Sequence, residues 1–319
     1  HREGRLPQRP LEPLLAELVR HGMSATADGC DLHCQGQLRS GDYVLPGDVS
    51  SQFVSALLLA LPLLPGDSTL TLTSAPESAP YIAMTEEVLA AAGISLYRTG
   101  SRYRIPGGQR YQLPSHLTVE GDWSSAAFFL CAGAMSREGI AVDGLSLPTR
   151  QGDSALLPLL RQMGAEVNLS SGCITVRKGR LRATDIDARP IPDLIPPLSV
   201  LAAAAEGGSH IQNARRLRYK ESDRLQGIAE LLNSLGGCLT VDGDDLLIHG
   251  VSHLQGGTVD PMGDHRLAMS AALAALSADA PVTVRDADCV SKSYPAFWAD
   301  FQSLKGEAPC PAPSETPSV

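Results

Sequence analysis

Four segments of the chain are apolar at nearly every position, and they alternate with segments that are apolar on one face only. The continuous runs lie at residues 53–63, 126–134, 198–205 and 267–276. A helix that is apolar all round is normally buried. The other type is seen at Leu11, Leu14, Leu15 and Leu18, whose spacing predicts an amphipathic helix that ends before Gly22. The pattern thus predicts one buried helix and one surface helix per unit, with the surface helix against a sheet.

Short alternating or apolar runs between these helices predict strands. In residues 117–177, strands are expected at 117–119 and 140–142, helices at 126–134 and around 156–163, and a hairpin from 166–169 to 173–176. The order is β-α-β-α-β-β. Similar hairpins are expected at 94–105 around Gly100 and at 238–248, and a last strand and helix at 282–284 and 297–304.

This unit recurs along the chain with a nearly constant period. Glycines that end the amphipathic helices are spaced by 71, 71 and 72 residues, and aspartates that open the apolar helices are spaced by 74, 71 and 71 residues. They are Gly22, Gly93, Gly164 and Gly236, and Asp48, Asp122, Asp193 and Asp264. Two markers with one period indicate an array of one supersecondary unit. Because His1 precedes an amphipathic helix directly, the first unit lacks its front half, and we expect the chain to be incomplete at its N-terminus.

Composition narrows the class of protein. With 319 residues and 43% hydrophobic content, the chain is long enough for two domains with a core each. Its longest apolar run, 56–64, is too short to cross a bilayer, and no signal peptide is recognisable. A cytosolic protein is expected.

Seven cysteines are dispersed along the chain. Only Cys30 and Cys34 lie close together, with His33 between them, and no second ligand pair stands at a spacing suited to a metal. We therefore expect reduced thiols and no metal site.

The net charge of −9 argues against a nucleic-acid surface, so an anionic ligand requires a local cluster of cations. Residues 215–224, RRLRYKESDR, supply one. On a helix, Lys220 and Arg224 would face the same way. A solvated charged face and a nucleic-acid patch are the alternatives, and Glu221 and Asp223 interrupt such a patch. Paired cations beside a carboxylate favour a small acidic substrate that undergoes proton transfer.

Three helix starts are further candidates. Asp264 is a good N-cap, and Arg266 in the first turn could bind an anion or pair with Asp264. The hydroxyls and amide of residues 50–52 could bind phosphate or only cap their helix, as the parallel residues at 122–125 suggest. Asp193 has no serine or cation beside it, so it is either a cap or a general base. Lys292, in a loop before the last helix, is uninformative alone.

Together these segments resemble the 5-enolpyruvylshikimate-3-phosphate synthases, the shikimate-pathway enzymes blocked by glyphosate. The resemblance runs from about residue 9 to 301, in family order and spacing. It rests on LPGDVSSQF at 45–53, APYI at 79–82, VEGDWSSA at 119–126, QGD at 151–153, KESDRL at 220–225, DHRLAM at 264–269 and KSYP at 292–295.

The resemblance implies an inside-out α/β barrel fold: two domains of three β-α-β-α-β-β units around buried helices. It divides this chain into the remainder of an N-terminal domain at 1–118, a C-terminal domain at 119–304 and a disordered tail at 305–319. The implied reaction moves the enolpyruvyl group of phosphoenolpyruvate onto the 5-hydroxyl of shikimate 3-phosphate and releases phosphate. It requires no metal or organic cofactor, and a complete enzyme would be monomeric.

Roles follow position by position from the resemblance. Asp193 resembles the base for the hydroxyl, and Glu221 and Lys220 the pair that handles the proton near the intermediate. The residues similar to the phosphoenolpyruvate ligands are Arg9, Arg224, Arg266 and Lys292. Those similar to the shikimate 3-phosphate ligands are Ser50, Ser51, Ser78 and Tyr81, together with Asp193 and Lys220, and Gln52 resembles a residue between both substrates.

Some family features are absent. The N-terminal Lys-Ser with its nearby Arg and the Asn-Ala-Gly-Thr loop are missing, Arg216 stands where some members have Asn, and the C-terminal sheet is expected to have an open edge. We therefore expect little activity from this chain alone. The alternatives are a non-catalytic fragment, half of a split enzyme that needs an N-terminal partner, a repeat-built binding scaffold, and the related transferase that acts on UDP-N-acetylglucosamine.

Overall fold

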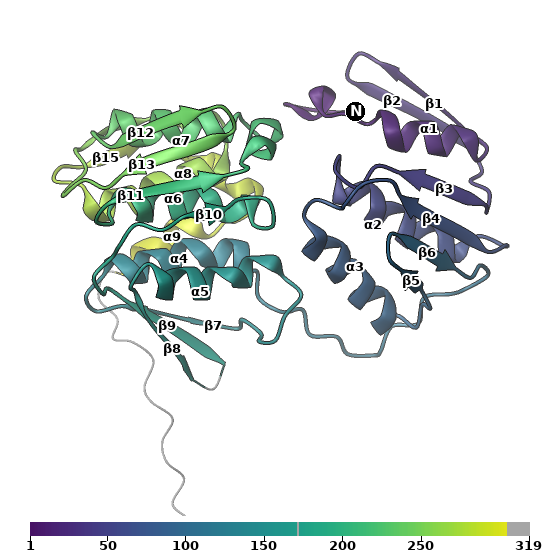
Figure 1. Cartoon of the computed structure of the whole chain (residues 1–319), viewed down its shortest axis with the longest axis horizontal. Helices are drawn as coiled ribbons and strands as arrows, with labels where there is room; N and C mark the ends of the chain where they lie inside the picture. Colours follow the sequence, from purple (N-terminus) through teal and green to yellow (C-terminus); the bar gives the residue numbers. More distant parts are fainter. Residues whose placement is uncertain (171, 305–319) are drawn as a thin grey trace, which may run out of the picture. The chain divides into compact units, whose positions relative to one another are not determined.

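The computed structural model describes residues 1–170 and 172–304, and these fall into two compact units (Figure 1). Unit 1 comprises residues 1–119 and 150–152, and unit 2 comprises residues 120–149 and the described residues from 153 onward. The expected division into a partial domain at 1–118 and a whole one at 119–304 stays a prediction. The expected disordered tail, 305–319, lies outside the described residues.

Unit 1 contains one complete β-α-β-α-β-β unit. Strands β3 (Asp42–Leu45) and β4 (Ser68–Leu72) are parallel and are joined through helix α2 (Ser51–Ala60) and the 3-10 turn η2 (Leu61–Leu63). Helix α3 (Ala79–Ala91) then leads to the hairpin β5 (Tyr97–Thr99) and β6 (Arg102–Ile105). The sheet order is β3-β4-β6-β5, so the hairpin folds back beside the second strand.

The start of unit 1 consists of a short turn, a helix and a separate hairpin. Turn η1 (Leu6–Gln8) precedes helix α1 (Glu12–Arg20), whose leucines pack against the core of Tyr43, Leu45 and neighbouring side chains. Strands β1 (Met23–Asp28) and β2 (Asp31–Gly36) pair antiparallel. The predicted amphipathic helix before Gly22 is confirmed.

Unit 2 repeats the same order of elements. Its complete unit runs β10 (Ile186–Asp187), α6 (Ile195–Ala203), β11 (Gly208–Gln212), α7 (Arg224–Ser234), β12 (Cys238–Asp242) and β13 (Asp245–His249). The sheet order β10-β11-β13-β12 is the same as that of unit 1. The repeat read from the sequence is therefore a repeat in three dimensions.

The other elements of unit 2 form two smaller sheets. Helix α4 (Trp123–Met135) precedes β7 (Ile140–Asp143), α5 (Leu156–Gln162), β8 (Glu166–Ser170) and β9 (Cys173–Arg177), with sheet order β7-β9-β8. Strands β14 (Gly257–Val259) and β15 (Val282–Val284) are parallel and flank α8 (His265–Ala274). Turn η7 (Ala287–Lys292) and helix α9 (Phe297–Ser303) follow.

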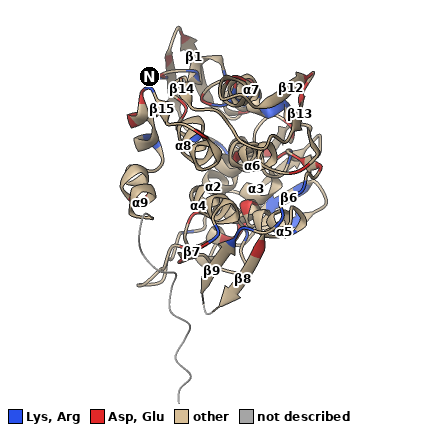
Figure 2. Cartoon of the chain, turned by 90° about the vertical axis from the view of Figure 1, so that its left-hand side faces the viewer, with Lys and Arg blue, Asp and Glu red and all other residues tan. Residues whose placement is uncertain are grey.

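The apolar helices of unit 2 are its core. Helices α4, α6 and α8 contact one another, and every residue of α6 is buried. Neither α4 nor α6 contains a charged residue, so both ribbons are tan throughout in Figure 2. The surface helix α7 is buried on one face, through residues such as Leu225, Ile228 and Leu232. This arrangement confirms the prediction of a buried and a surface helix for unit 2. In unit 1 the prediction for the run 53–63 is wrong in part, because α2 is buried on one face and Leu59 and Leu63 are 44% and 50% exposed.

The marker glycines adopt a backbone conformation that other residues rarely adopt. The φ angles of Gly22, Gly93, Gly164 and Gly236 are 100°, 75°, 94° and 77°. At Gly164 a Cβ atom would also lie 2.3 Å from the carbonyl oxygen of Arg180. The period of 71 or 72 residues thus records a left-handed helix C-cap in each unit.

One predicted strand is wrong. Residues 117–119 are irregular, and Val119 is 84% exposed. No strand in the described part of the chain pairs with this segment, so its backbone lacks the hydrogen bonds to a neighbouring strand that would make it part of a sheet. The three predicted hairpins are confirmed.

Two further observations concern membranes and metals. Within residues 1–170 and 172–304, helices are all too short or too polar to cross a bilayer. The six cysteines described are free thiols. Residues 1–170 and 172–304 contain no group of three or more His, Cys, Asp or Glu side chains that could hold a metal ion.

Candidate active site

The charged segment at 215–224 is not one continuous helix. A 3-10 turn, η5 (Arg215–Tyr219), ends at Lys220, whose backbone is extended, and α7 begins only at Arg224. The predicted helical i, i+4 relation of Lys220 and Arg224 is therefore wrong. The extended loop still brings both side chains to the same carboxylate, that of Asp193.

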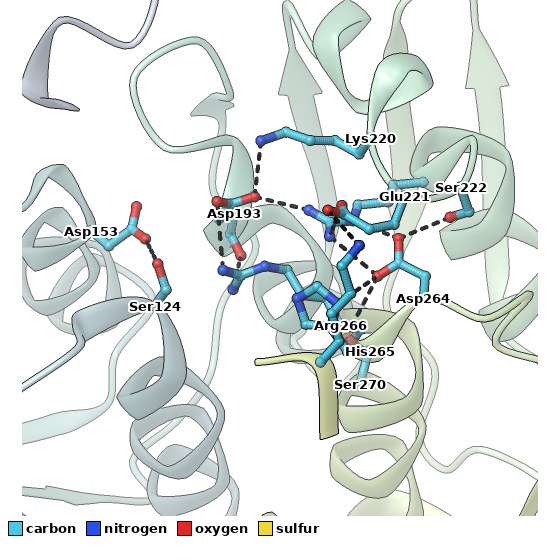
Figure 3. Close-up of polar contacts among 12 residues, drawn as sticks. Ser124, Asp153, Asp193, Lys220, Glu221, Ser222, Asp264, His265, Arg266 and Ser270 are labelled. Carbon is cyan, nitrogen blue, oxygen red and sulfur yellow. Dashed lines mark hydrogen bonds and ion pairs between the residues drawn. The ribbon is translucent and has the colours of Figure 1, made fainter. Parts of the chain in front are cut away.

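Asp193 contacts the cations Lys220, Arg224 and Arg266, and Figure 3 labels the first and the last of these. It belongs to the 3-10 turn η4 (Pro192–Leu194) that leads into α6, and its side chain does not cap that helix. Its Oδ1 accepts from Arg224 Nη1 at 2.8 Å and lies 3.2 Å from Lys220 Nζ, and its Oδ2 lies 3.5 Å from Arg266 Nη2. Of the two functions predicted for Asp193, capping is excluded and the general base stays a prediction.

Arg224 is almost completely buried and donates to three different carboxylates. Besides Asp193, its Nη2 donates to Glu221 Oε2 at 2.7 Å, and its Nε donates to Asp264 Oδ2 at 2.7 Å. Only 1% of the side chain is exposed. A buried guanidinium needs such partners, because an unpaired charge in the interior costs several kcal/mol.

Glu221 joins the segment before α7 to the segment after α8. Its Oε1 accepts from Lys292 Nζ at 3.2 Å, while Oε2 accepts from Arg224. Lys292, at the end of η7, is half exposed. The lysine that was uninformative in the sequence thus reaches the same cluster of charges from 71 residues away.

Asp264 caps α8, as predicted. Its Oδ1 accepts from the backbone N–H of Arg266 at 3.0 Å, and its carboxylate is fully buried. The prediction that the Arg266 side chain pairs with Asp264 is wrong. The guanidinium of Arg266 instead turns to Asp193, where it contacts Oδ2 and, at 3.4 Å, the backbone carbonyl.

The cations shift the pKa values of the acids in one direction. Burial alone would raise the pKa of Asp193, but Arg266, Lys220 and Arg224 hold it far below its usual range. Burial would also raise the pKa of Glu221, but Arg224, a backbone hydrogen bond and Lys292 together lower it to about 2. Burial lowers the pKa of Lys220, and Asp193 opposes that shift. With these neighbours the two acids are ionised and weakly basic.

His265 is a site residue that the sequence did not single out. Its ring is buried, and its Nδ1 finds no hydrogen-bond partner among the described residues; the Asp264 carboxylate is 3.9 Å away. Burial, followed by Arg266 and Arg224, lowers the pKa of His265 to about 4. The ring is therefore neutral near pH 7.

The second site feature that the sequence did not reveal is the pair Ser124 and Asp153. Ser124 Oγ, at the start of α4, donates a short hydrogen bond to Asp153 Oδ2, and Asp153 is only 4% exposed. Burial raises the pKa of Asp153 to about 6, with Ser124 opposing and Asp193 adding to the shift. Both residues lie in stretches that carry the family resemblance, but nothing in their spacing predicts that they touch.

In unit 1 the residues predicted to bind shikimate 3-phosphate lie on two adjacent helix starts. Ser50 caps α2 by accepting from Gln52 N–H at 3.2 Å, and Ser51 is buried. Asp48 does not cap the helix, contrary to its place in the aspartate series, because its Oδ1 accepts from Ser74 Oγ at 2.6 Å instead. Hydrogen bonds such as Glu77 N to Gly47 O join the loop before α2 to the loop before α3.

The start of α3 holds the other two predicted ligands. Ser78 has a left-handed backbone, with φ of 52°, and its carbonyl accepts from the N–H of Tyr81. Arg9 follows turn η1 in the same unit. The structure therefore groups Ser50, Ser51 and Gln52 with Ser78 and Tyr81 in unit 1 through their loops, and the catalytic candidates in unit 2. The functions of all these residues stay predictions.

The arrangement in unit 2 combines proton-transfer groups with anion-binding groups. Four cations, Lys220, Arg224, Arg266 and Lys292, contact three carboxylates, Asp193, Glu221 and Asp264. Arginine forks and lysine ammonium groups bind carboxylate and phosphate. Such a site suits the chemistry of a small polyanion whose hydroxyl or carbon exchanges a proton.

Comparison with known proteins agrees with this chemistry. Residues 3–301 match the family model described as EPSP synthase (3-phosphoshikimate 1-carboxyvinyltransferase). The chain is 41% identical over 310 residues to the 3-phosphoshikimate 1-carboxyvinyltransferase of Clostridium kluyveri, covering 96% of this chain and 72% of that relative. It is 40% identical over 301 residues to the enzyme of the same name from Methanocorpusculum labreanum, covering 94% and 71%.

Solved structures confirm the expected fold. EPSP synthase from Acinetobacter baumannii superposes with a TM-score of 0.77 and 28% identity, covering 95% of this chain and 72% of that one. The enolpyruvyl transferase NikO from Streptomyces tendae also gives a TM-score of 0.77, at 23% identity, with 94% and 72% covered. The second likeness concerns the fold alone.

Proposed function

Because the chain belongs to the EPSP synthase family, we propose that it transfers the enolpyruvyl group of phosphoenolpyruvate to the 5-hydroxyl of shikimate 3-phosphate. The products are 5-enolpyruvylshikimate 3-phosphate and inorganic phosphate. The observation that carries the proposal is the convergence of Lys220, Arg224 and Arg266 on the Asp193 carboxylate. Both substrates are polyanions, and this cluster concentrates positive charge on an otherwise acidic protein.

The proposed chemistry has an addition step and an elimination step. In the addition, Asp193 takes the proton of the 5-hydroxyl, the oxygen bonds to C2 of phosphoenolpyruvate, and C3 gains a proton from the pair formed by Glu221 and Lys220. In the elimination, C3 gives up a proton to this pair while the bond from C2 to the phosphate oxygen breaks. The phosphate takes up the proton that Asp193 removed from the hydroxyl and leaves, and the enol ether remains. Every side chain thus returns to its starting protonation state, and protons and electron pairs balance.

The geometry supports a base that strengthens when the substrates bind. With three cations around it, Asp193 has a pKa too low for efficient proton abstraction. Lys220 and Arg266 are also predicted ligands of the substrate anions. When they turn to a bound phosphate or carboxylate, the positive charge at Asp193 falls and its pKa rises. The site then provides its base only where substrate is present.

The proposed substrate ligands follow the family resemblance. Arg266 and Lys292, with Arg9 and Gln52, are assigned to phosphoenolpyruvate. Those assigned to shikimate 3-phosphate are Ser50, Ser51, Gln52, Ser78, Tyr81, Asp193 and Lys220. Arg224 is also assigned to phosphoenolpyruvate, although in the ligand-free protein its nitrogens are taken by carboxylates. No metal or organic cofactor is assigned to the reaction.

The test is phosphate release by the purified chain with shikimate 3-phosphate and phosphoenolpyruvate, with product mass measured in parallel. We expect release only with both substrates present. Release with UDP-N-acetylglucosamine in place of shikimate 3-phosphate would contradict the proposed acceptor. An arm with the N-terminal part of a relative added in trans tests the split-enzyme alternative, and no release in any arm would support a non-catalytic chain.

A further inference from the structure

We propose that Asp264 is a positioning residue for the transfer reaction, which acts by fixing the orientation of Arg224. The inference rests on the proposed function, since it concerns how the acids of that reaction are held. Asp264 has no assigned contact with either substrate, and the sequence alone indicates only a helix cap.

Asp264 makes far more contacts than a cap requires. An N-cap needs one oxygen for one backbone N–H. Asp264 Oδ1 accepts from Arg266 N, but the carboxylate also accepts from Ser222 Oγ at 3.0 Å and twice from Arg224. Asp122, the cap of α4, instead accepts hydrogen bonds from its neighbours Ser124 and Ser125.

The two bonds to Arg224 fix the plane of its guanidinium. Nε donates to Oδ2 at 2.7 Å, and Nη2 donates to Oδ1 at 3.2 Å, so the contact is bidentate. Since the guanidinium is rigid and planar, holding these two nitrogens also sets the direction of Nη1. Nη1 donates to Asp193, and Nη2 also reaches Glu221. One carboxylate thus determines where the arginine holds the proposed base and the proposed proton-handling acid.

Asp264 also joins three separate parts of the site. It binds Ser222 in the loop before α7, Arg224 at the first turn of α7, and the N–H of Arg266 at the first turn of α8. The carboxylate is fully buried, so water does not compete for these donors. Its loss would release the loop, the arginine and the helix start together.

The test is a double-mutant cycle with Asp264→Asn and Arg224→Lys. Asparagine keeps an oxygen for the helix cap but loses the charge and the bidentate contact. We expect kcat to fall on the order of 10- to 100-fold in D264N, with a smaller change in KM for phosphoenolpyruvate, as is typical when a partner that orients a catalytic group is removed. In the R224K background the same substitution should change kcat by less than about threefold, because the group it orients is gone.

Control variants separate positioning from folding. Asp122→Asn makes the same change at another helix cap, and its thermal unfolding shows how much the loss of charge at a cap costs by itself. Asp264→Glu keeps the charge but displaces the carboxylate by one methylene, so we expect a folded protein with reduced kcat. This variant keeps the proposal testable if D264N does not fold.

Three outcomes would overturn the inference. The first is additive effects of the two substitutions on kcat, and the second is full activity in a folded D264E variant. The third is a fall in kcat matched by an equal rise in KM, of the same size in the R224K background. If the unaltered chain releases no phosphate, the proposed function fails. The double-mutant cycle is then measured through the dissociation constant for shikimate 3-phosphate, by calorimetry. Non-additive weakening there would still support the positioning role, whereas additive changes or no binding would overturn it.

Discussion

The starts of helices α2 and α8 occupy the same place in the repeat, but the first is neutral and the second is charged. In unit 1, Ser50 caps α2, and the residues after it, Ser51 and Gln52, are neutral. In unit 2, Asp264 caps α8, and His265 and Arg266 follow. Both caps accept one N–H from the residue two positions on. The structural requirement is therefore the same, and the charge at α8 serves another purpose.

The difference shows what a buried carboxylate needs from the rest of the chain. Asp264 can be fully buried because Arg224, 40 residues earlier, supplies a paired guanidinium. Asp153 is an intermediate case: it is buried against Ser124, no cation in the described part of the chain pairs with it directly, and burial raises its pKa to about 6. At the start of α8 the buried charge is thus stabilised by a counter-charge from a second segment of the chain.

The largest expected effect comes from removing the base in the charged cluster. Asp193→Asn should lower kcat on the order of 1,000-fold, within the range of general acid–base catalysis. The affinity for phosphoenolpyruvate should hold or increase, because Arg266 loses an internal competitor. Stopped phosphate-release assays and calorimetry measure the two quantities, and the exposed Asp187→Asn serves as a control. A parallel loss of affinity would show that Asp193 acts by holding the cations.

The second prediction concerns the cation that distinguishes α8 from α2. Arg266→Lys removes the planar fork, and we expect phosphoenolpyruvate to bind about 10- to 100-fold more weakly, which corresponds to the loss of charged hydrogen bonds. Arg180→Lys, in an exposed pair with Glu206, should have almost no effect. Equal calorimetric affinities for the two variants would mean that the charged helix start does not bind this substrate.

The third prediction concerns Asp153, whose contribution to stability should depend on pH. The folded-state pKa of Asp153, about 6, lies above its unfolded value of about 3.9, so the folded state binds more protons between these values. The contribution of Asp153 to stability is therefore full below about pH 4, falls as pH rises to about 6, and remains unfavourable above.

Asp153→Asn should remove this loss and stabilise the protein on the order of 2 kcal/mol at pH 8, with no gain near pH 4. Urea unfolding of both proteins across this range measures the difference. A constant difference between the two proteins at all pH values would contradict a titrating Asp153.

The smallest effect is expected at the neutral cap. Ser50→Ala should destabilise the protein by about 1 kcal/mol through loss of the hydrogen bond to Gln52 N–H. Ser50→Thr keeps the hydroxyl and should lose less. Urea unfolding measures both, and equal stabilities of the alanine variant and the unaltered chain would show that the cap at α2 does not contribute.

Much of the fold was predictable because each repeat carries two markers in the sequence, a glycine that ends one helix and an apolar run that forms the other. Positive-φ glycines such as Gly164 and continuous apolar runs such as that of α6 reflect local constraints, and local constraints are visible in sequence. The strand at 117–119 was predicted wrongly because a strand also needs a partner, and no described strand lies beside it.

The site was predictable only in part, for a similar reason. Asp264 as a cap follows from its neighbours, but its pairing with Arg224 depends on how α7 and α8 pack. Because the backbone at Lys220 is extended, the helical i, i+4 spacing with Arg224 was a wrong prediction, although Lys220 still contacts Asp193. Contacts such as that of Ser124 with Asp153 have no signal in spacing or composition.

The three cations around Asp193 also bear on how the protein responds to salt. A surface that binds anions usually holds ions from solution and releases them on binding, so affinity falls steeply as ionic strength rises. Here Asp193 and its neighbouring acids neutralise the cations from within the fold. A substrate anion exchanges with a carboxylate that stays attached to the chain, so few ions pass to the solvent. Recognition of a highly charged substrate then depends only weakly on ionic strength.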